Sequence, residues 1–262
     1  MINALAALLD QVPLPAIPAV LLAIFLLAAE LGFACHRRYG GSKSGLGGGG
    51  EDETQVLSTA LLVLALLLGF TFSMALDRYD ERRQLVVQEA NDIGTAWLRA
   101  GLVPAPHGPA LQNALRDYAG LRQSSPLPHE TAKLARAADQ RNRVWQLTTA
   151  AQATLDGPRA VSLTSAVNAV LDTGTQREKA VAARVPGEVM LLLVLFAAVT
   201  CFLLGYVLDA HGQRHRLASG ILFLLMGLTI MLILDLDRPV DGAILVDQSA
   251  MQALVASLAV VP

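Results

Sequence analysis

The chain has 262 residues, of which 53% are hydrophobic and only 16% are charged, and its mean hydropathy is +0.47. A soluble domain of this length is usually less apolar, so the composition favours a membrane protein over a soluble enzyme. The formal net charge of −2 provides no basic field, and we therefore expect no nucleic-acid partner.

Four apolar segments are long enough to cross a bilayer, which takes about 20 residues in an α-helix with a rise of about 1.5 Å per residue. They cover residues 19–34, 55–76, 189–208 and 217–234. The segment Met1–Gln11 contains no Lys or Arg and so lacks the basic region of a signal peptide. We expect the first span to be retained, with residues 2–9 lying on the membrane or packed against it. The predicted fold is all-α, a polytopic membrane protein with four transmembrane helices.

The spans divide the chain into four parts. An N-terminal part (1–76) holds spans one and two, joined by a glycine-rich linker (40–50) that is too rich in glycine to hold a fixed structure. A helical block (77–187) separates them from a hairpin of spans three and four (188–235), and a tail (236–262) follows. Proline-containing breaks predict helices in the block and tail near 78–100, 108–123, 128–154, 158–183 and 247–259.

The positive-inside rule gives a narrow preference for the orientation. Seven Lys or Arg residues near the membrane accompany the block and both termini, against five in the two short loops. We therefore expect the termini and the 77–187 block to be cytoplasmic.

No familiar catalytic pattern occurs in the sequence. A phosphate-binding loop, a His-Glu-x-x-His motif and a Gly-x-Ser-x-Gly motif are all absent, so we expect no enzyme, no catalytic residue and no cofactor. His211 and His215 have i, i+4 spacing but lie in a short loop beside arginines, and we predict no metal site there. Cys35 and Cys201 are expected to be buried free thiols.

Three acidic residues lie at the ends of spans. Asp235 and Asp237 are alternate residues that do not face each other on a helix, so we expect them to pair with nearby arginines rather than to bind a cation. Glu30 lies within the first span, where an ionisable residue suggests a function. It could belong to a membrane pathway, or it could reach the basic pair Arg37 and Arg38.

The segment from Leu68 to Arg83 is the most informative in the chain. It begins as the end of an apolar span and becomes densely charged without any turn residue, which predicts one helix that leaves the membrane. The hydroxyls of Thr71 and Ser73 lie just inside the charged border, as in a pathway for small ions. The same helical face carries apolar and then polar side chains: Leu62, Leu66, Phe70, Ser73 and Asp77.

This segment resembles the second membrane helix of bacterial bestrophins. The matching positions are Leu68, Gly69, Phe70, Ser73, Ala75, Asp77, Arg78, Tyr79, Glu81 and Arg83. The following 89–100 segment, with Glu89 and Asn91, is similar to bestrophin-like domain proteins. So is the later run that contains Asp235, Asp237 and Arg238.

The resemblance implies a homopentameric channel, here expected in a bacterial inner membrane, with the second spans around a central pore. Carried over, it places a hydrophobic neck at Leu62, Leu66 and Phe70. Thr71, Ser73 and Asp77 would follow as a polar lining. The partners would be further copies of the chain, the lipid bilayer and small inorganic ions. Two departures are a Tyr79-Asp80 pair where the family has paired aromatics, and the lack of the acidic run that binds calcium in animal bestrophins.

Ion preference and even channel function leave alternatives open. The 78–187 block has 14 Lys or Arg against 10 Asp or Glu, an excess that favours small anions such as chloride. Leu62 and Leu66 could instead face lipid or other helices. A membrane-anchored sensor or scaffold, with a ligand-binding helical domain and no pore, is the main alternative. A transporter with alternating access predicts symmetry between halves, which the sequence lacks.

Overall fold

The computed structural model describes residues 14–39, 49–123, 131–210, 215–239 and 242–260, and every regular element in these ranges is helical. Residues 2–9, the linker residues 40–48 and His211 lie outside the described residues. The elements are η1 (Leu14–Ala16), α2 (Ile17–Tyr39), α3 (Gly49–Ala100), α4 (His107–Arg122), α5 (Thr131–Gln152), α6 (Gly157–Ala182), α7 (Gly187–Ala210), α8 (Arg216–Asp237) and α9 (Ser249–Val260). The all-α prediction is confirmed.

Within the described residues, four helices are long and apolar enough to cross a membrane, as the sequence predicts: α2, the first part of α3, α7 and α8. Helix α3 has 52 residues and runs without a break from its apolar part into its charged part, which confirms the single helix expected there. The chain divides into two compact units. Unit 1 comprises Met1–Asp77 with Val185–Arg238, and unit 2 comprises Arg78–Arg184 with Pro239–Pro262.

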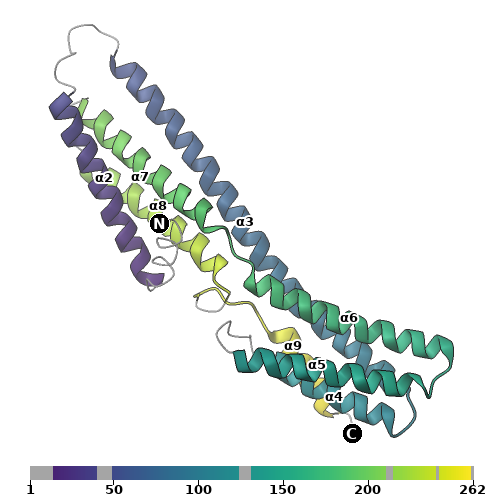
Figure 1. The fold of residues 1–262 in the computed structure, drawn as a ribbon. Coiled ribbons are helices and arrows are strands. Elements are labelled where there is room, and N and C mark those ends of the chain that lie inside the picture. The colour runs from purple at the N-terminus through teal and green to yellow at the C-terminus, as the bar shows by residue number, and fades with distance from the viewer. Residues whose placement is uncertain (1–13, 40–48, 124–130, 211–214, 240–241, 261–262) are drawn as a thin grey trace. The chain divides into compact units, whose positions relative to one another are not determined.

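In unit 1, α2 packs against both α7 and α8 (Figure 1). Glycines allow the backbones of α2 and α7 to approach closely. A Cβ atom at Gly32 would overlap the Phe202 carbonyl oxygen, and one at Gly205 would overlap that of Ala29. This packing therefore depends on the two missing side chains.

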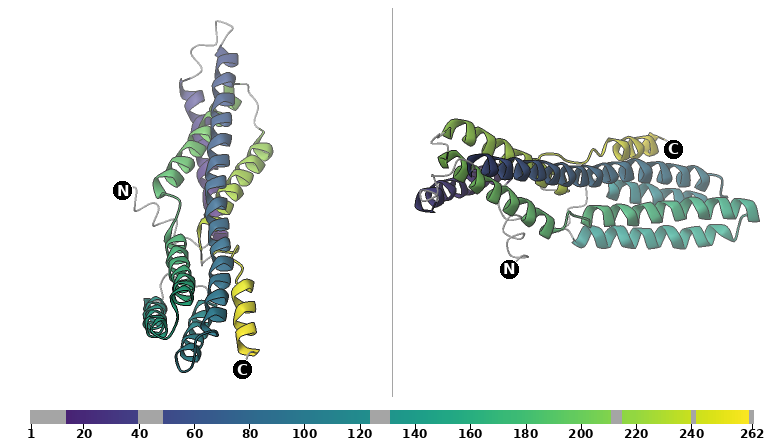
Figure 2. Two further views of the ribbon diagram at one scale, coloured as in Figure 1. Left: turned by 90° about the vertical axis from the view of Figure 1, so that its right-hand side faces the viewer. Right: turned by 90° about the horizontal axis from the view of Figure 1, so that it is seen from above.

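Unit 2 is a helical bundle in which α4 packs against α5 and α9, while α5 packs against α6. Figure 2 shows α5 and α6 running side by side. The predicted start of α6 is confirmed by its cap, because the Asp156 carboxylate accepts a hydrogen bond of 3.1 Å from the Arg159 backbone N–H. Pro158 in the first turn needs no hydrogen-bond partner for its nitrogen.

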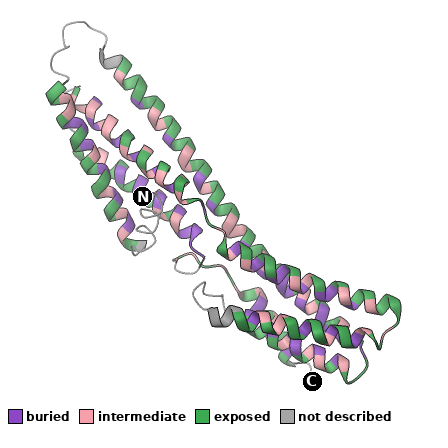
Figure 3. Ribbon diagram, viewed as in Figure 1, coloured by how far each residue is buried: buried purple, intermediate pink, exposed green. Residues whose placement is uncertain are grey.

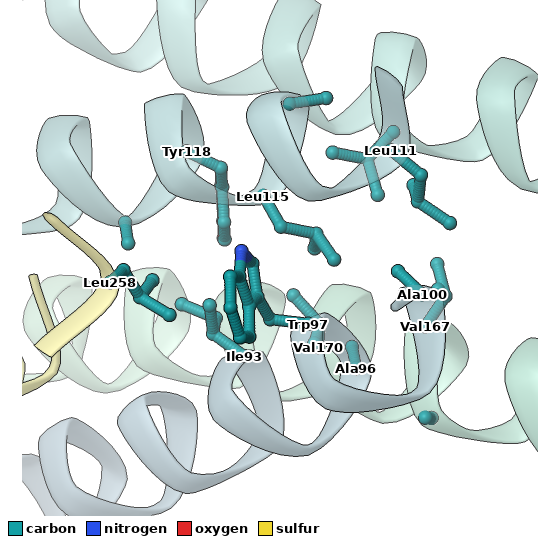
Figure 4. Close-up of a cluster of buried hydrophobic side chains, with 14 of the residues drawn as sticks. Ile93, Ala96, Trp97, Ala100, Leu111, Leu115, Tyr118, Val167, Val170 and Leu258 are labelled. Carbon is teal, nitrogen blue, oxygen red and sulfur yellow. The ribbon is translucent and has the colours of Figure 1, made fainter. Parts of the chain in front are cut away.

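The core of unit 2 surrounds Trp97 on α3 (Figure 4). Buried side chains from α3, α4, α6 and α9 contribute to one cluster: Ile93, Ala96, Trp97, Ala100, Leu111, Leu115, Tyr118, Val167, Val170 and Leu258. The tail helix α9 thus shares the core of the 78–184 segment, which the sequence order alone does not indicate.

Candidate functional site

The membrane part of α3 leaves an unusually large surface uncovered. Only 17% of its most apolar window is buried within the chain, against 39% for α2, 33% for the window that includes α7, and 28% for α8. Exposed and half-buried residues dominate this part of α3 in Figure 3. Most of this helix surface must therefore be in contact with a further copy of the chain, with lipid or with the interior of a pore.

One exposed face of α3 combines both chemical characters that the sequence predicts for a pore wall. Leu62 is 63% exposed, Leu66 52% and Phe70 69%. Ser73 and Asp77 are also exposed, and the helical repeat places them on the same face. The structure thus brings five of the six predicted neck and lining residues onto one open surface, which we call the α3 stripe.

Thr71 does not belong to the α3 stripe. It is 3% exposed, and its hydroxyl donates a hydrogen bond of 2.5 Å to the carbonyl oxygen of Leu67. Leu57, Leu64 and Ala75 share this buried side of the helix. Thr71 directly follows Phe70, and its side chain lies on a different side of the helix because successive residues on an α-helix are about 100° apart.

The α3 stripe continues toward the start of the helix with polar residues that the sequence analysis missed. Asp52, Gln55 and Thr59 are exposed and fall on the same helical face as Leu62. The helical spacing that identified Leu62 and Leu66 would have found them. The stripe is therefore polar at both ends and apolar in the middle.

The remaining motif residues take two different positions. Gly69, Glu81, Arg83 and Asn91 are exposed, and Arg78 is half-buried. Ala75, Glu89, Asp235, Asp237 and Arg238 are buried. A carboxylate oxygen of Asp237 accepts a hydrogen bond of 2.8 Å from the Val185 N–H, so this acid tethers the start of α7 to the end of α8 through the backbone.

Glu89 is the centre of a buried charge network in unit 2. Its Oε1 accepts hydrogen bonds from the Tyr118 hydroxyl (2.9 Å) and the Arg122 Nε (2.7 Å), while its Oε2 accepts one of 2.7 Å from Arg177. Arg177 also donates to the Gln248 Oε1 at 2.6 Å, next to α9. Helices α3, α4 and α6 meet at this carboxylate, and Arg177 links it to the segment before α9. No local pattern indicates these partners.

Burial and charge set the protonation of this network. Burial raises the pKa of Tyr118, and the negative charge of Glu89 raises it further. Burial alone lowers the pKa of Arg122, but Glu89, Tyr118 and Glu178 more than reverse the change and raise it. For Arg177, burial is the larger effect and its pKa is lowered. The arrangement keeps Tyr118 neutral as a donor.

Charged side chains also join the helix ends of unit 1. The Asp209 carboxylate lies 3.1 Å from the His36 Nδ1 and 3.3 Å from the Arg37 Nε. Glu30 pairs with Arg216 at 3.4 Å, so of its two predicted roles it has a pairing role, but with a different arginine from the expected Arg37 and Arg38.

The described residues contain no group of three or more His, Cys, Asp or Glu that could hold a metal ion. His215 belongs to these residues, whereas its predicted neighbour His211 does not. Cys201 is buried and Cys35 half-buried, and both are free.

The comparisons with known proteins agree with the fold. The sequence model described as "Bestrophin-like domain" matches residues 22–251. A mutant of a bacterial bestrophin homologue from Klebsiella pneumoniae is 17% identical, with a TM-score of 0.65 over 95% of this chain and 97% of that one. The same homologue, solved by zinc phasing, gives a TM-score of 0.62 at 17% identity over 92% and 96% of the two chains. No curated protein matches the sequence.

Proposed function

The chain belongs to the bestrophin-like family, and from this premise we propose that it forms an ion channel whose pore is lined by α3. Family membership and the fold support an ion channel in general. The observation that carries the finer proposal is the α3 stripe, an exposed face with a polar start, an apolar middle and a polar end. A helix that faces lipid has no need of this order.

Leu62, Leu66 and Phe70 form the neck of the proposed pore. Copies of these exposed side chains around a central axis make a narrow apolar ring, which hydrated ions cross only at high cost and which can empty of water to close. Ser73 and Asp77 then offer a hydroxyl and a carboxylate. Thr71 is left out of the proposed lining because its side chain is buried within the subunit.

The charges on the α3 stripe support a preference for monovalent cations. Asp52 and Asp77 lie at its two ends, and no Lys or Arg occurs between residues 44 and 77. Rings of carboxylates attract cations and repel anions. Among the described residues, burial of Arg82, Arg122 and Arg177, against one buried acid, Glu89, halves the excess of basic residues in 78–187 that favoured anions. We therefore propose cation conduction in place of the expected anion conduction.

For the assembly we propose the homopentamer implied by the resemblance, in a bacterial inner membrane with the 77–187 block in the cytoplasm. The large uncovered surface of α3 supports self-association, because a single apolar helix with so little burial leaves much area for neighbouring copies. The mass of the purified particle tests this directly. A monomer or dimer contradicts the pore.

The neck is tested by truncating its side chains. Leu66→Ala and Phe70→Ala widen the apolar ring, and we expect each to raise ion flux from proteoliposomes. Leu225→Ala is the control, because Leu225 is 56% exposed but lies on α8. Unchanged flux in both neck variants of a conducting protein places the constriction elsewhere, and a complete absence of conductance favours the sensor or scaffold.

Selectivity is tested by reversal potentials in a planar bilayer with a potassium chloride gradient. We expect the natural protein to give a reversal potential with the sign that cation selectivity produces. Asp77→Asn and Asp52→Asn should each shift this reversal potential toward zero. Glu188→Gln removes an exposed carboxylate from the start of α7 and serves as the matched control. A reversal potential with the sign of anion selectivity, unchanged in both α3 variants, contradicts the proposed lining.

A further inference from the structure

A groove in unit 1 opens between α2, α7 and α8, near the ends joined by Asp209 and its partners. Its volume is about 290 Å³, close to the lower end of small-molecule pockets at about 300 Å³. The walls are largely apolar and include Leu26, Phe33, Leu208 and Phe223. Such a space fits part of an acyl chain rather than a whole lipid.

The groove exists because the three helices pack unequally. At Gly205, which lines the groove, α7 lies directly against Ala29 of α2. Phe223 of α8 meets Phe25 of α2 edge to face, with ring centroids 6.5 Å apart. Toward the start of α8, Ser219 and Arg216 also line the groove, but as smaller or more exposed residues than Phe223.

Two opposite charges line the same groove. The Glu30 carboxylate and the Arg216 guanidinium are 3.4 Å apart, with side chains that are 54% and 66% exposed. Glu30 lies six residues before His36, or about 9 Å along the helix axis, and Arg216 begins α8. Both charges therefore lie near the end of the spans, where lipid head groups meet the hydrocarbon.

We propose that this groove binds a glycerophospholipid with a primary-amine head group, of the phosphatidylethanolamine class. One acyl chain occupies the apolar groove. The phosphate accepts hydrogen bonds from Arg216, and the ammonium group donates to Glu30. The existing pair is long and exposed, and such pairs are weak, so the head group can replace each partner of the pair with one of its own.

The arrangement distinguishes among common lipid head groups. A quaternary choline carries the same charge as ethanolamine but has no N–H to donate to Glu30. A phosphatidylglycerol head group is anionic without a compensating ammonium group, so Glu30 repels it. The groove thus selects for a zwitterion that also donates hydrogen bonds.

Lipid retention by the purified full-length protein tests the proposal. The protein is incubated in detergent with equal amounts of dioleoyl phosphatidylethanolamine, phosphatidylcholine and phosphatidylglycerol, passed through a sizing column, and its bound lipid is measured by mass spectrometry. We expect enrichment of phosphatidylethanolamine. Glu30→Gln should reduce the ethanolamine-to-choline ratio about twofold to fivefold, the range for an exposed ion pair. Glu188→Gln should leave it unchanged.

A second variant separates the groove from the head-group contacts. Leu26→Trp introduces a large ring at a residue that is 42% exposed and lines the groove, so it should fold and lower the retention of all three lipids. The proposal is overturned if the retained lipids match the added mixture, if Glu30→Gln behaves like Glu188→Gln, or if Leu26→Trp retains as much lipid as the natural protein. None of these readouts depends on conduction.

Discussion

Replacing Glu89 by glutamine should destabilise unit 2 more than any other single carboxylate-to-amide change in its described part. Glu89 is fully buried and accepts hydrogen bonds from Tyr118, Arg122 and Arg177. Glutamine keeps one acceptor oxygen but points an N–H₂ donor at a guanidinium. Among the described residues, the two buried cations Arg122 and Arg177 then have one carboxylate left between them, Glu178, which pairs with Arg122 and not with Arg177.

The size of the effect follows from the burial of these charges. Removing one partner of a buried ion pair costs about 3–5 kcal/mol, because the other charge stays buried without compensation. At about 2–4 °C per kcal/mol for a protein of this size, the melting temperature should fall by about 6–20 °C. The measurement is thermal unfolding of the full chain in detergent, followed by circular dichroism.

Two comparisons make this prediction specific. Glu81→Gln changes an exposed carboxylate on the same helix, and its effect should stay within about 0.5 kcal/mol. Arg177→Met should cost less than Glu89→Gln, since Glu89 keeps Arg122 as a partner. If Glu89→Gln has the same melting temperature as Glu81→Gln, or if Arg177→Met lowers the melting temperature more than Glu89→Gln does, the reasoning about uncompensated charge is wrong.

Three further variants probe the packing of the two units by thermal unfolding. Gly174→Ala should destabilise the protein by about 1–3 kcal/mol because its Cβ would overlap the Tyr118 hydroxyl. Gly120→Ala, whose Cβ would meet nothing within 4 Å, should be neutral or stabilising, and equal effects of the two variants contradict the prediction. Tyr118→Phe should reduce the loss of stability above pH 10. Burial and Glu89 raise the pKa of Tyr118 from 10.0, so only the unfolded state releases this proton there. A loss of stability that the variant leaves unchanged refutes the assignment. Gly205→Ala should force α2 and α7 apart and lower the melting temperature, unlike Gly220→Ala, which has open space.

Much of the fold follows from hydropathy and chain-breaking residues. The four apolar segments and the helices of the 78–184 segment lie close to their predicted bounds, because apolar length and proline position act locally. The uninterrupted α3 agrees with the absence of proline and of adjacent turn residues between Leu68 and Arg83. The α3 stripe follows from helical spacing, and only Thr71, one residue beyond Phe70, falls on the wrong side.

The partners of charged residues required the tertiary structure. Glu30 could be assigned a pairing role from sequence, but its partner Arg216 is 186 residues away. Glu89 resembles any other acid in a charged helix until α4 and α6 bring Tyr118, Arg122 and Arg177 to it. Gln248, before α9, joins the network through Arg177.

The sequence by itself thus determined the helices, their membrane-spanning length and the order of apolar and polar residues along α3, since each depends on the spacing of neighbouring residues. The tertiary structure decided which side of α3 stays open, which charges are buried together, and that α9 completes the core of unit 2. These features depend on contacts between segments far apart in the chain. The hydrophobic effect that drives such contacts is non-directional, so the spacing of neighbouring residues does not indicate which distant segments will meet.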